Sequence, residues 1–106
     1  MAAVVYLVTD LLLTSKIRET ATQLGLDVQA VRAAGDVASA TADARWFIVD
    51  LRRPDAIAAL EAAAPAAKKI GFIDHERTDV MDAARARGCV ALAKGKFSSE
   101  LPRLLL

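Results

Sequence analysis

The sequence predicts an α/β protein, a three-layer, doubly wound fold around a five-stranded parallel sheet. Short apolar runs alternate with alanine-rich segments of helical periodicity along the whole chain. Several of these runs are continuous, as in strands that are covered on both faces. The segments between them provide the helical crossovers that parallel strands need, and such crossovers are right-handed.

The first third of the chain predicts two strands and a helix. Val4–Val8 is a continuous apolar run, typical of a buried strand. The helix follows it, and Gly25 is well placed to end that helix in a left-handed conformation. The segment 27–32 alternates imperfectly and predicts a second strand. The apolar stripe of the helix consists of Leu13, Ile17, Ala21 and Leu24.

The next segment predicts a short helix and a third strand. Asp36 is a candidate N-cap for a helix that reaches Ala44, although serine and threonine weaken helical propensity there. Trp46–Val49 is an apolar run that predicts a buried strand, and Asp50 closes it.

Two helices and a strand are expected next. A helix is expected over residues 54–65, because it opens with a proline, which suits a first helical turn. Lys69–Ile73 predicts the fourth strand. Thr78 and Asp79 are candidate caps of the following helix, which Gly88 is expected to end.

The end of the chain completes the pattern. Val90–Ala93 predicts a fifth strand, and Ser98 or Ser99 is expected to cap a last helix that ends at Leu106. The alternation shows no repeat and no low-complexity linker. We therefore expect a single domain over residues 1–106.

Composition excludes several functional classes. The 14 Lys+Arg against 13 Asp+Glu give a net charge of +1, which argues against a nucleic-acid partner. No apolar stretch approaches the ~20 residues that span a bilayer, and the amino terminus lacks a secretory signal. We therefore expect a cytoplasmic protein without a membrane partner. The single cysteine, Cys89, excludes an internal disulfide and is expected to be buried and inert.

Candidate functional residues follow the predicted strands. In open parallel sheets, ligands and chemistry lie at the carboxyl ends of the strands. The polar residues that follow the strands are Thr9, Asp10, Asp50, Asp74, His75 and Lys94.

The segment that starts at Asp50 resembles the phosphoacceptor segment of response-regulator receiver domains. In that family an aspartate ends the third strand and a proline follows four residues later, as Asp50 and Pro54 do here. Gly88–Leu92 resembles the family's helix stop and fifth strand, and Phe97 matches a common aromatic residue just beyond. The chain is similar to this family in length and element order as well. The resemblance implies a flavodoxin-like, receiver-like fold.

The resemblance also implies a site. Asp50 would be the phosphoacceptor, and Asp10 and Asp50 would hold magnesium. Receivers usually have two acidic residues after the first strand, whereas this chain has Thr9 and Asp10. A lysine after the fifth strand pairs with the phosphoryl group in the family. That position falls at Gly95 here, so Lys94 is the candidate phosphate partner if the strand end shifts register.

Other departures from the family favour a degenerate receiver. A serine or threonine follows the fourth strand in receivers, but the matching position here is Asp74, whose carboxylate repels a phosphoryl group. We therefore expect a pseudo-receiver that acts by protein–protein interaction in a two-component-type pathway. The alternatives are a working receiver phosphorylated at Asp50 with magnesium, and a small α/β metal-dependent enzyme or ligand binder that uses Asp10, Asp50 and Asp74.

The resemblance implies a partner surface over Asp79–Leu106, because receivers usually bind partners through the fourth helix, fifth strand and fifth helix. The expected partner is a histidine kinase, an effector protein or a second copy of the chain. Leu104–Leu106 is hard to bury on a short helix and indicates an exposed interface.

Several of these residues also have an expected structural role. Asp10 is an N-cap candidate for the first helix, and Asp50 is a candidate cap for the loop that follows it. Arg52 and Arg53 are expected to be solvated in a surface loop, and His75 is expected to be a lone exposed histidine.

Overall fold

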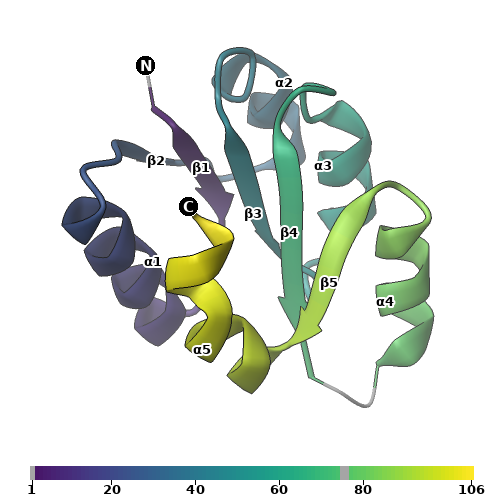
Figure 1. The fold of residues 1–106 in the computed structure, drawn as a ribbon. Helices are drawn as coiled ribbons and strands as arrows, with labels where there is room; N and C mark the ends of the chain where they lie inside the picture. Colours follow the sequence, from purple (N-terminus) through teal and green to yellow (C-terminus); the bar gives the residue numbers. More distant parts are fainter. Residues whose placement is uncertain (1, 75–76) are drawn as a thin grey trace.

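A computed structural model of the chain describes residues 2–74 and 77–106. It has one five-stranded sheet with the strand order β2-β1-β3-β4-β5, and every neighbouring pair of strands is parallel (Figure 1). Helices cover both faces of this sheet, which confirms the predicted fold class. The strands are β1 (Val4–Leu7), β2 (Val28–Ala30), β3 (Trp46–Asp50), β4 (Lys68–Ile73) and β5 (Cys89–Ala93).

The helices form the two outer layers. One face of the sheet packs against α1 and α5, and the other packs against α2, α3 and α4 (Figure 1). A short 3₁₀ turn, η1 (Ala34–Asp36), leads into α2. None of the helices in the described part of the chain is long and apolar enough to cross a membrane. The helices are α1 (Leu11–Gln23), α2 (Val37–Ala40), α3 (Ala56–Ala62), α4 (Thr78–Arg85) and α5 (Lys94–Leu104).

Both faces of the central strands are buried, as their continuous apolar sequences predict. In β1, Val4 and Tyr6 join the core beneath α1 and α5, whereas Val5 and Leu7 join the core on the opposite face. On the α5 side the rings of Phe72 and Phe97 lie with their centroids 4.7 Å apart. Packing on both faces fixes where the strand ends lie.

Two helix stops were predicted correctly. Gly25 and Gly88 follow α1 and α4 with φ values of 72° and 79°, in the left-handed region that glycine adopts without a steric penalty. Asp10 is the N-cap of α1, and its side chain accepts hydrogen bonds from the backbone N–H groups of Leu12 and Leu13. The predicted structural role of Asp10 is therefore confirmed.

Other predicted caps are wrong. Asp36 makes no capping hydrogen bond to α2, because η1 precedes that helix and keeps the backbone of Asp36 helical. Thr78 and Asp79 lie inside the first turn of α4. Arg77 occupies the N-cap position, and its side chain makes no capping hydrogen bond. The third helix begins at Ala56 rather than at Pro54, because residues 51–55 form turns after β3.

The start of the last helix also differs from the prediction. Helix α5 begins at Lys94, directly after β5, and not at Ser98 or Ser99. Ala93 is its N-terminal flanking residue and provides no side-chain cap. The helix therefore has 11 residues, which is longer than the segment expected after a serine cap.

This longer helix buries most of the terminal leucines. Phe97, Leu101 and Leu105 recur every four residues and face the sheet, and Leu105 is only 2% exposed. Leu104 is partly buried against the same core, and Leu106 is 79% exposed. The expectation that Leu104–Leu106 forms an exposed apolar patch is wrong, because Leu105 lies on the same face as Phe97 and Leu101, which packs against the sheet.

The free edge of β5 is partly protected. Arg85, near the end of α4, donates a hydrogen bond from Nη2 to the carbonyl oxygen of Ala91 at 2.9 Å. This contact ties α4 to the edge strand of the sheet.

Candidate functional site

Three of the predicted site residues meet at the carboxyl edge of the sheet. Asp50 is the last residue of β3, Asp10 follows β1, and Lys94 directly follows β5. Asp74 follows β4 and is exposed, and His75 lies outside the described residues. Within residues 2–74 and 77–106, no three His, Cys, Asp or Glu side chains are placed to hold a metal ion, so Asp74 does not complete a three-carboxylate site.

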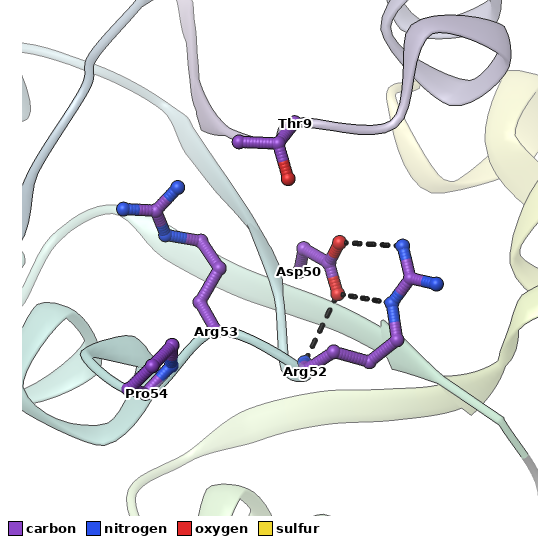
Figure 2. A pocket seen from close by; sticks show the side chains of 5 residues that line it. All are labelled: Thr9, Asp50, Arg52, Arg53 and Pro54. Carbon is purple, nitrogen blue, oxygen red and sulfur yellow. Dashed lines mark hydrogen bonds and ion pairs between the residues drawn. The ribbon is translucent and has the colours of Figure 1, made fainter.

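Asp50 is almost completely buried, with 1% of its surface exposed, and Arg52, two residues later, binds its carboxylate. The guanidinium of Arg52 donates from Nε to Oδ1 at 3.1 Å and from Nη2 to Oδ2 at 2.9 Å (Figure 2). The backbone N–H of Arg52 also donates to Oδ1, at 3.0 Å. Both oxygens of the candidate phosphoacceptor are therefore engaged, in the bidentate geometry typical of a strong arginine–carboxylate pair.

Arg52 also approaches the second carboxylate of the site. Its Nη2 lies 3.7 Å from Oδ2 of Asp10, and Nζ of Lys94 lies 2.8 Å from the same oxygen. Lys94, Asp10, Arg52 and Asp50 thus form a sequence of ion pairs with alternating charge, which we call the charge chain. Its two cations balance its two anions.

The charge chain stabilises its own ionised form. The Lys94 ammonium lowers the pKa of Asp10, and the backbone N–H of Leu13 acts in the same direction. The hydrogen bonds to Asp50 raise the pKa of Arg52 above its usual value. Opposite charges and hydrogen bonds favour the charged forms, so these two members stay ionised at neutral pH.

Arg53 points away from the charge chain. It donates from Nε and Nη2 to the two carboxylate oxygens of Asp55, at 2.8 Å and 3.1 Å, and from Nη2 to the carbonyl of Arg32 at 3.1 Å. Asp55 in turn accepts a hydrogen bond from the backbone N–H of Ala34. The expectation that Arg52 and Arg53 are merely solvated is wrong, because each finds an aspartate two positions away.

A cavity of about 460 Å³ lies beside Asp50. Figure 2 shows the Arg52 and Arg53 side chains on either side of the Asp50 carboxylate. The cavity is polar on these sides and reaches the end of β1. Its lining residues are Thr9, Asp50, Arg52, Arg53 and Pro54.

The carboxylates as they stand do not fit a magnesium ion. Magnesium needs near-octahedral oxygen ligands, usually one or two carboxylates with several waters. Oδ1 of Asp10 accepts backbone hydrogen bonds at the start of α1, and its Oδ2 binds Lys94. Both oxygens of Asp50 bind Arg52. A divalent cation would have to displace one of these positive side chains.

The other candidate groups add no nucleophile. Lys94 reaches into the site because α5 begins at that residue, but its ammonium contacts Asp10. Burial raises the pKa of the Cys89 thiol to about 12, so the reactive thiolate is scarce at neutral pH. The expectation of a buried cysteine is confirmed.

The fold of the chain is shared with known structures. No protein-family model matches the chain, and no curated protein matches it significantly. A de novo designed Rossmann 2x3 fold protein, solved by solution NMR, is 16% identical with a TM-score of 0.72, over 99% of this chain and 90% of that one. The isolated REC domain of RcsB from Salmonella enterica serovar Typhimurium, in its apo form, is 18% identical with a TM-score of 0.71, over 99% and 85%.

At these identities the likeness is one of fold. The match to a REC domain shows that the chain has the fold expected from the receiver resemblance. The match to a designed protein shows that a similar fold also occurs in a protein that is not a natural receiver. Function therefore has to be argued from the site itself.

Proposed function

We propose that the chain is a receiver-like signalling module that acts by binding a partner protein, without phosphorylation of Asp50. The engagement of both Asp50 carboxylate oxygens by Arg52 carries this proposal. The likeness to a REC domain supports the receiver-like class.

The chemistry of phosphoryl transfer supports a degenerate site. An aspartate acts as a nucleophile through a carboxylate oxygen, and Arg52 holds both oxygens of Asp50. Phosphoryl transfer also depends on a cation that neutralises charge on the transferring group. Magnesium does not fit these carboxylates while Arg52 and Lys94 remain bound to them.

Beryllofluoride, which mimics a phosphoryl group on aspartate, tests the proposal on the native chain. We expect no change in the amide NMR signals around Asp50 when beryllofluoride is added with magnesium. Asp50→Asn is the matched control, because it keeps the size of the side chain and removes its charge. Shifts centred on Asp50 that disappear in Asp50→Asn would show a working receiver and overturn the proposal.

We propose Asp79–Leu106 as the partner surface, for a histidine kinase or an effector protein. This stretch contains α4, the edge strand β5 and α5. Val90 and Leu92 on β5 are partly exposed, and Leu106, two residues beyond α5, is 79% exposed. These side chains provide apolar contacts on this surface.

A second copy of the chain is the simplest partner to test on this surface. Analytical ultracentrifugation of Leu106→Glu should show weaker self-association than the native chain. Leu12→Glu is the matched control, because Leu12 is also exposed but lies on α1. Equal self-association in all three proteins would place any dimer contact elsewhere. Leu105→Glu is unsuitable, because Leu105 is buried.

A further inference from the structure

We infer that Arg52 is a built-in cation that replaces a divalent metal ion between Asp10 and Asp50 and makes this site independent of metal. The inference deepens the proposed function and rests on it, since both require the Asp50 carboxylate to be engaged within the chain. Arg52 is thus a positioning residue that sets which cation the two carboxylates can bind.

The position of one nitrogen atom supports this role. Nη2 of Arg52 lies 2.9 Å from Oδ2 of Asp50 and 3.7 Å from Oδ2 of Asp10. These carboxylates lie at the ends of the neighbouring strands β1 and β3 and would repel each other without a positive charge between them. The guanidinium therefore supplies the neutralisation that a bound metal ion would otherwise supply.

The local backbone holds Arg52 in place. Its own N–H donates to Oδ1 of Asp50, and the N–H of Arg53 donates to the Asp50 carbonyl at 3.2 Å, which closes a tight turn after β3. The cation is thus tethered two residues from its carboxylate. A tether this short gives the guanidinium a high effective concentration, so a metal ion in solution competes poorly with it.

Removal of the guanidinium would leave a site suited to a divalent ion. Asp50 would keep a nearly buried carboxylate whose remaining partner is the backbone N–H of residue 52. The cavity beside Asp50, of about 460 Å³, has room for the waters that magnesium retains. Asp10 would supply a second carboxylate, although Lys94 would still compete for it.

Magnesium chloride, titrated at constant ionic strength, is the probe. The full chain is compared with Arg52→Ala and with Arg53→Ala, the matched control whose arginine also pairs with an aspartate two positions away. Amide NMR shifts of residues 9–11 and 50–53 report binding. In Arg52→Ala we expect shifts that saturate at millimolar magnesium. The dissociation constant for magnesium should be at least tenfold lower in this variant than in the native chain or in Arg53→Ala.

A second variant and a second readout keep the test decisive. Arg52→Gln retains much of the side-chain volume without the charge and should also gain magnesium binding, even if Arg52→Ala fails to fold. Magnesium should raise the melting temperature of the Arg52 variants alone. The additional change Asp50→Asn in either variant should abolish both responses.

Two results would overturn the inference. One is magnesium binding at these amides in the native chain that is as tight as in the Arg52 variants, because Arg52 would then exclude nothing. The other is no gain of binding in either Arg52 variant. Both differ from failure of the proposed function, which is a beryllofluoride response in the native chain.

Discussion

Arg52 and Arg53 are adjacent in sequence and form ion pairs of the same kind in different surroundings. Each binds both carboxylate oxygens of an aspartate two positions away: Arg52 binds Asp50 behind it, and Arg53 binds Asp55 ahead of it. The Asp50 side chain is 2% exposed, whereas the Asp55 side chain is 29% exposed. One pair lies at the candidate site, and the other fastens a loop.

Burial decides what each pair does. A buried carboxylate has little access to water, so loss of its partner leaves an uncompensated charge in a medium of low dielectric constant. A partly exposed carboxylate regains water when its partner leaves, and its ion pair contributes little net stability. The Arg52 pair should therefore control the chemistry of the site, and the Arg53 pair should affect mainly local order.

The largest expected effect is that of Arg52→Ala on stability. At pH 7 without divalent cations, the free energy of unfolding should fall by about 3 kcal/mol, because Asp50 stays buried without its cation. Urea denaturation measures this change. A loss as small as that of Arg53→Ala would show that burial does not distinguish the two pairs.

A smaller effect is expected from Gly71→Ala, beneath the site. A Cβ at Gly71 in β4 would lie 2.9 Å from Cγ and Cδ1 of Leu51, the residue between Asp50 and Arg52. Such overpacking should cost about 2 kcal/mol in urea denaturation. Amide signals should shift at Asp50 and Arg52 more than at Asp55.

The matched control for this change is Gly95→Ala. Gly95 lies in α5, and an added Cβ meets nothing within 4 Å. Alanine is the better helix former, so this variant should be as stable as the native chain or more stable. Equal destabilisation by both alanines would contradict the steric explanation.

Arg53→Ala should cost about 1 kcal/mol, since Asp55 is partly exposed and can be rehydrated. The effect should be local, because Arg53 and Asp55 hold Arg32 and Ala34 after β2. Hydrogen exchange at the Ala34 amide should become faster while exchange in β3 stays unchanged. Unchanged exchange at Ala34 would argue against this fastening role.

The smallest expected effect is the pH dependence of the Arg53 pair. The Arg53 guanidinium lowers the pKa of Asp55 below its usual value near 3.8. A carboxyl group whose pKa is lower in the folded chain stabilises it above the unfolded pKa, and this stabilisation is lost as the pH falls through the folded pKa. The difference in melting temperature between native and Arg53→Ala proteins should therefore shrink from pH 7 to pH 3. A constant difference would contradict this linkage.

Much of the fold could be predicted because the strands and helices follow regular patterns of apolar residues in the sequence. Val4–Val8 and Trp46–Val49 are apolar without interruption, and only central strands of a parallel sheet bury both faces. Gly25 and Gly88 mark helix ends through their backbone freedom. The start of α5 was missed because a helix that follows a strand directly, at Lys94, needs no serine cap.

The positions of Asp10 and Asp50 could also be predicted, since the strand ends fix them. The role of Arg52 could not be predicted, because an arginine in a turn has many rotamers, and the sequence does not show that this side chain binds Asp50 and also approaches Asp10 from another strand end. The useful sequence signal is local: an arginine two residues after an aspartate that ends a buried strand can fold back onto it. The contact of Lys94 with Asp10 could not be predicted either, because it depends on where α5 begins.

The hydrogen bond from Arg85 to the Ala91 carbonyl limits how another chain can attach to the sheet. An edge strand with free carbonyl and N–H groups can accept an additional strand from a partner or from a second copy, which leads to β-augmentation or to aggregation. In β5 one of these carbonyl groups is already satisfied from within the chain. A partner that docks over α4, β5 and α5 and leaves this hydrogen bond intact should therefore recognise side chains rather than add a sixth strand to the sheet.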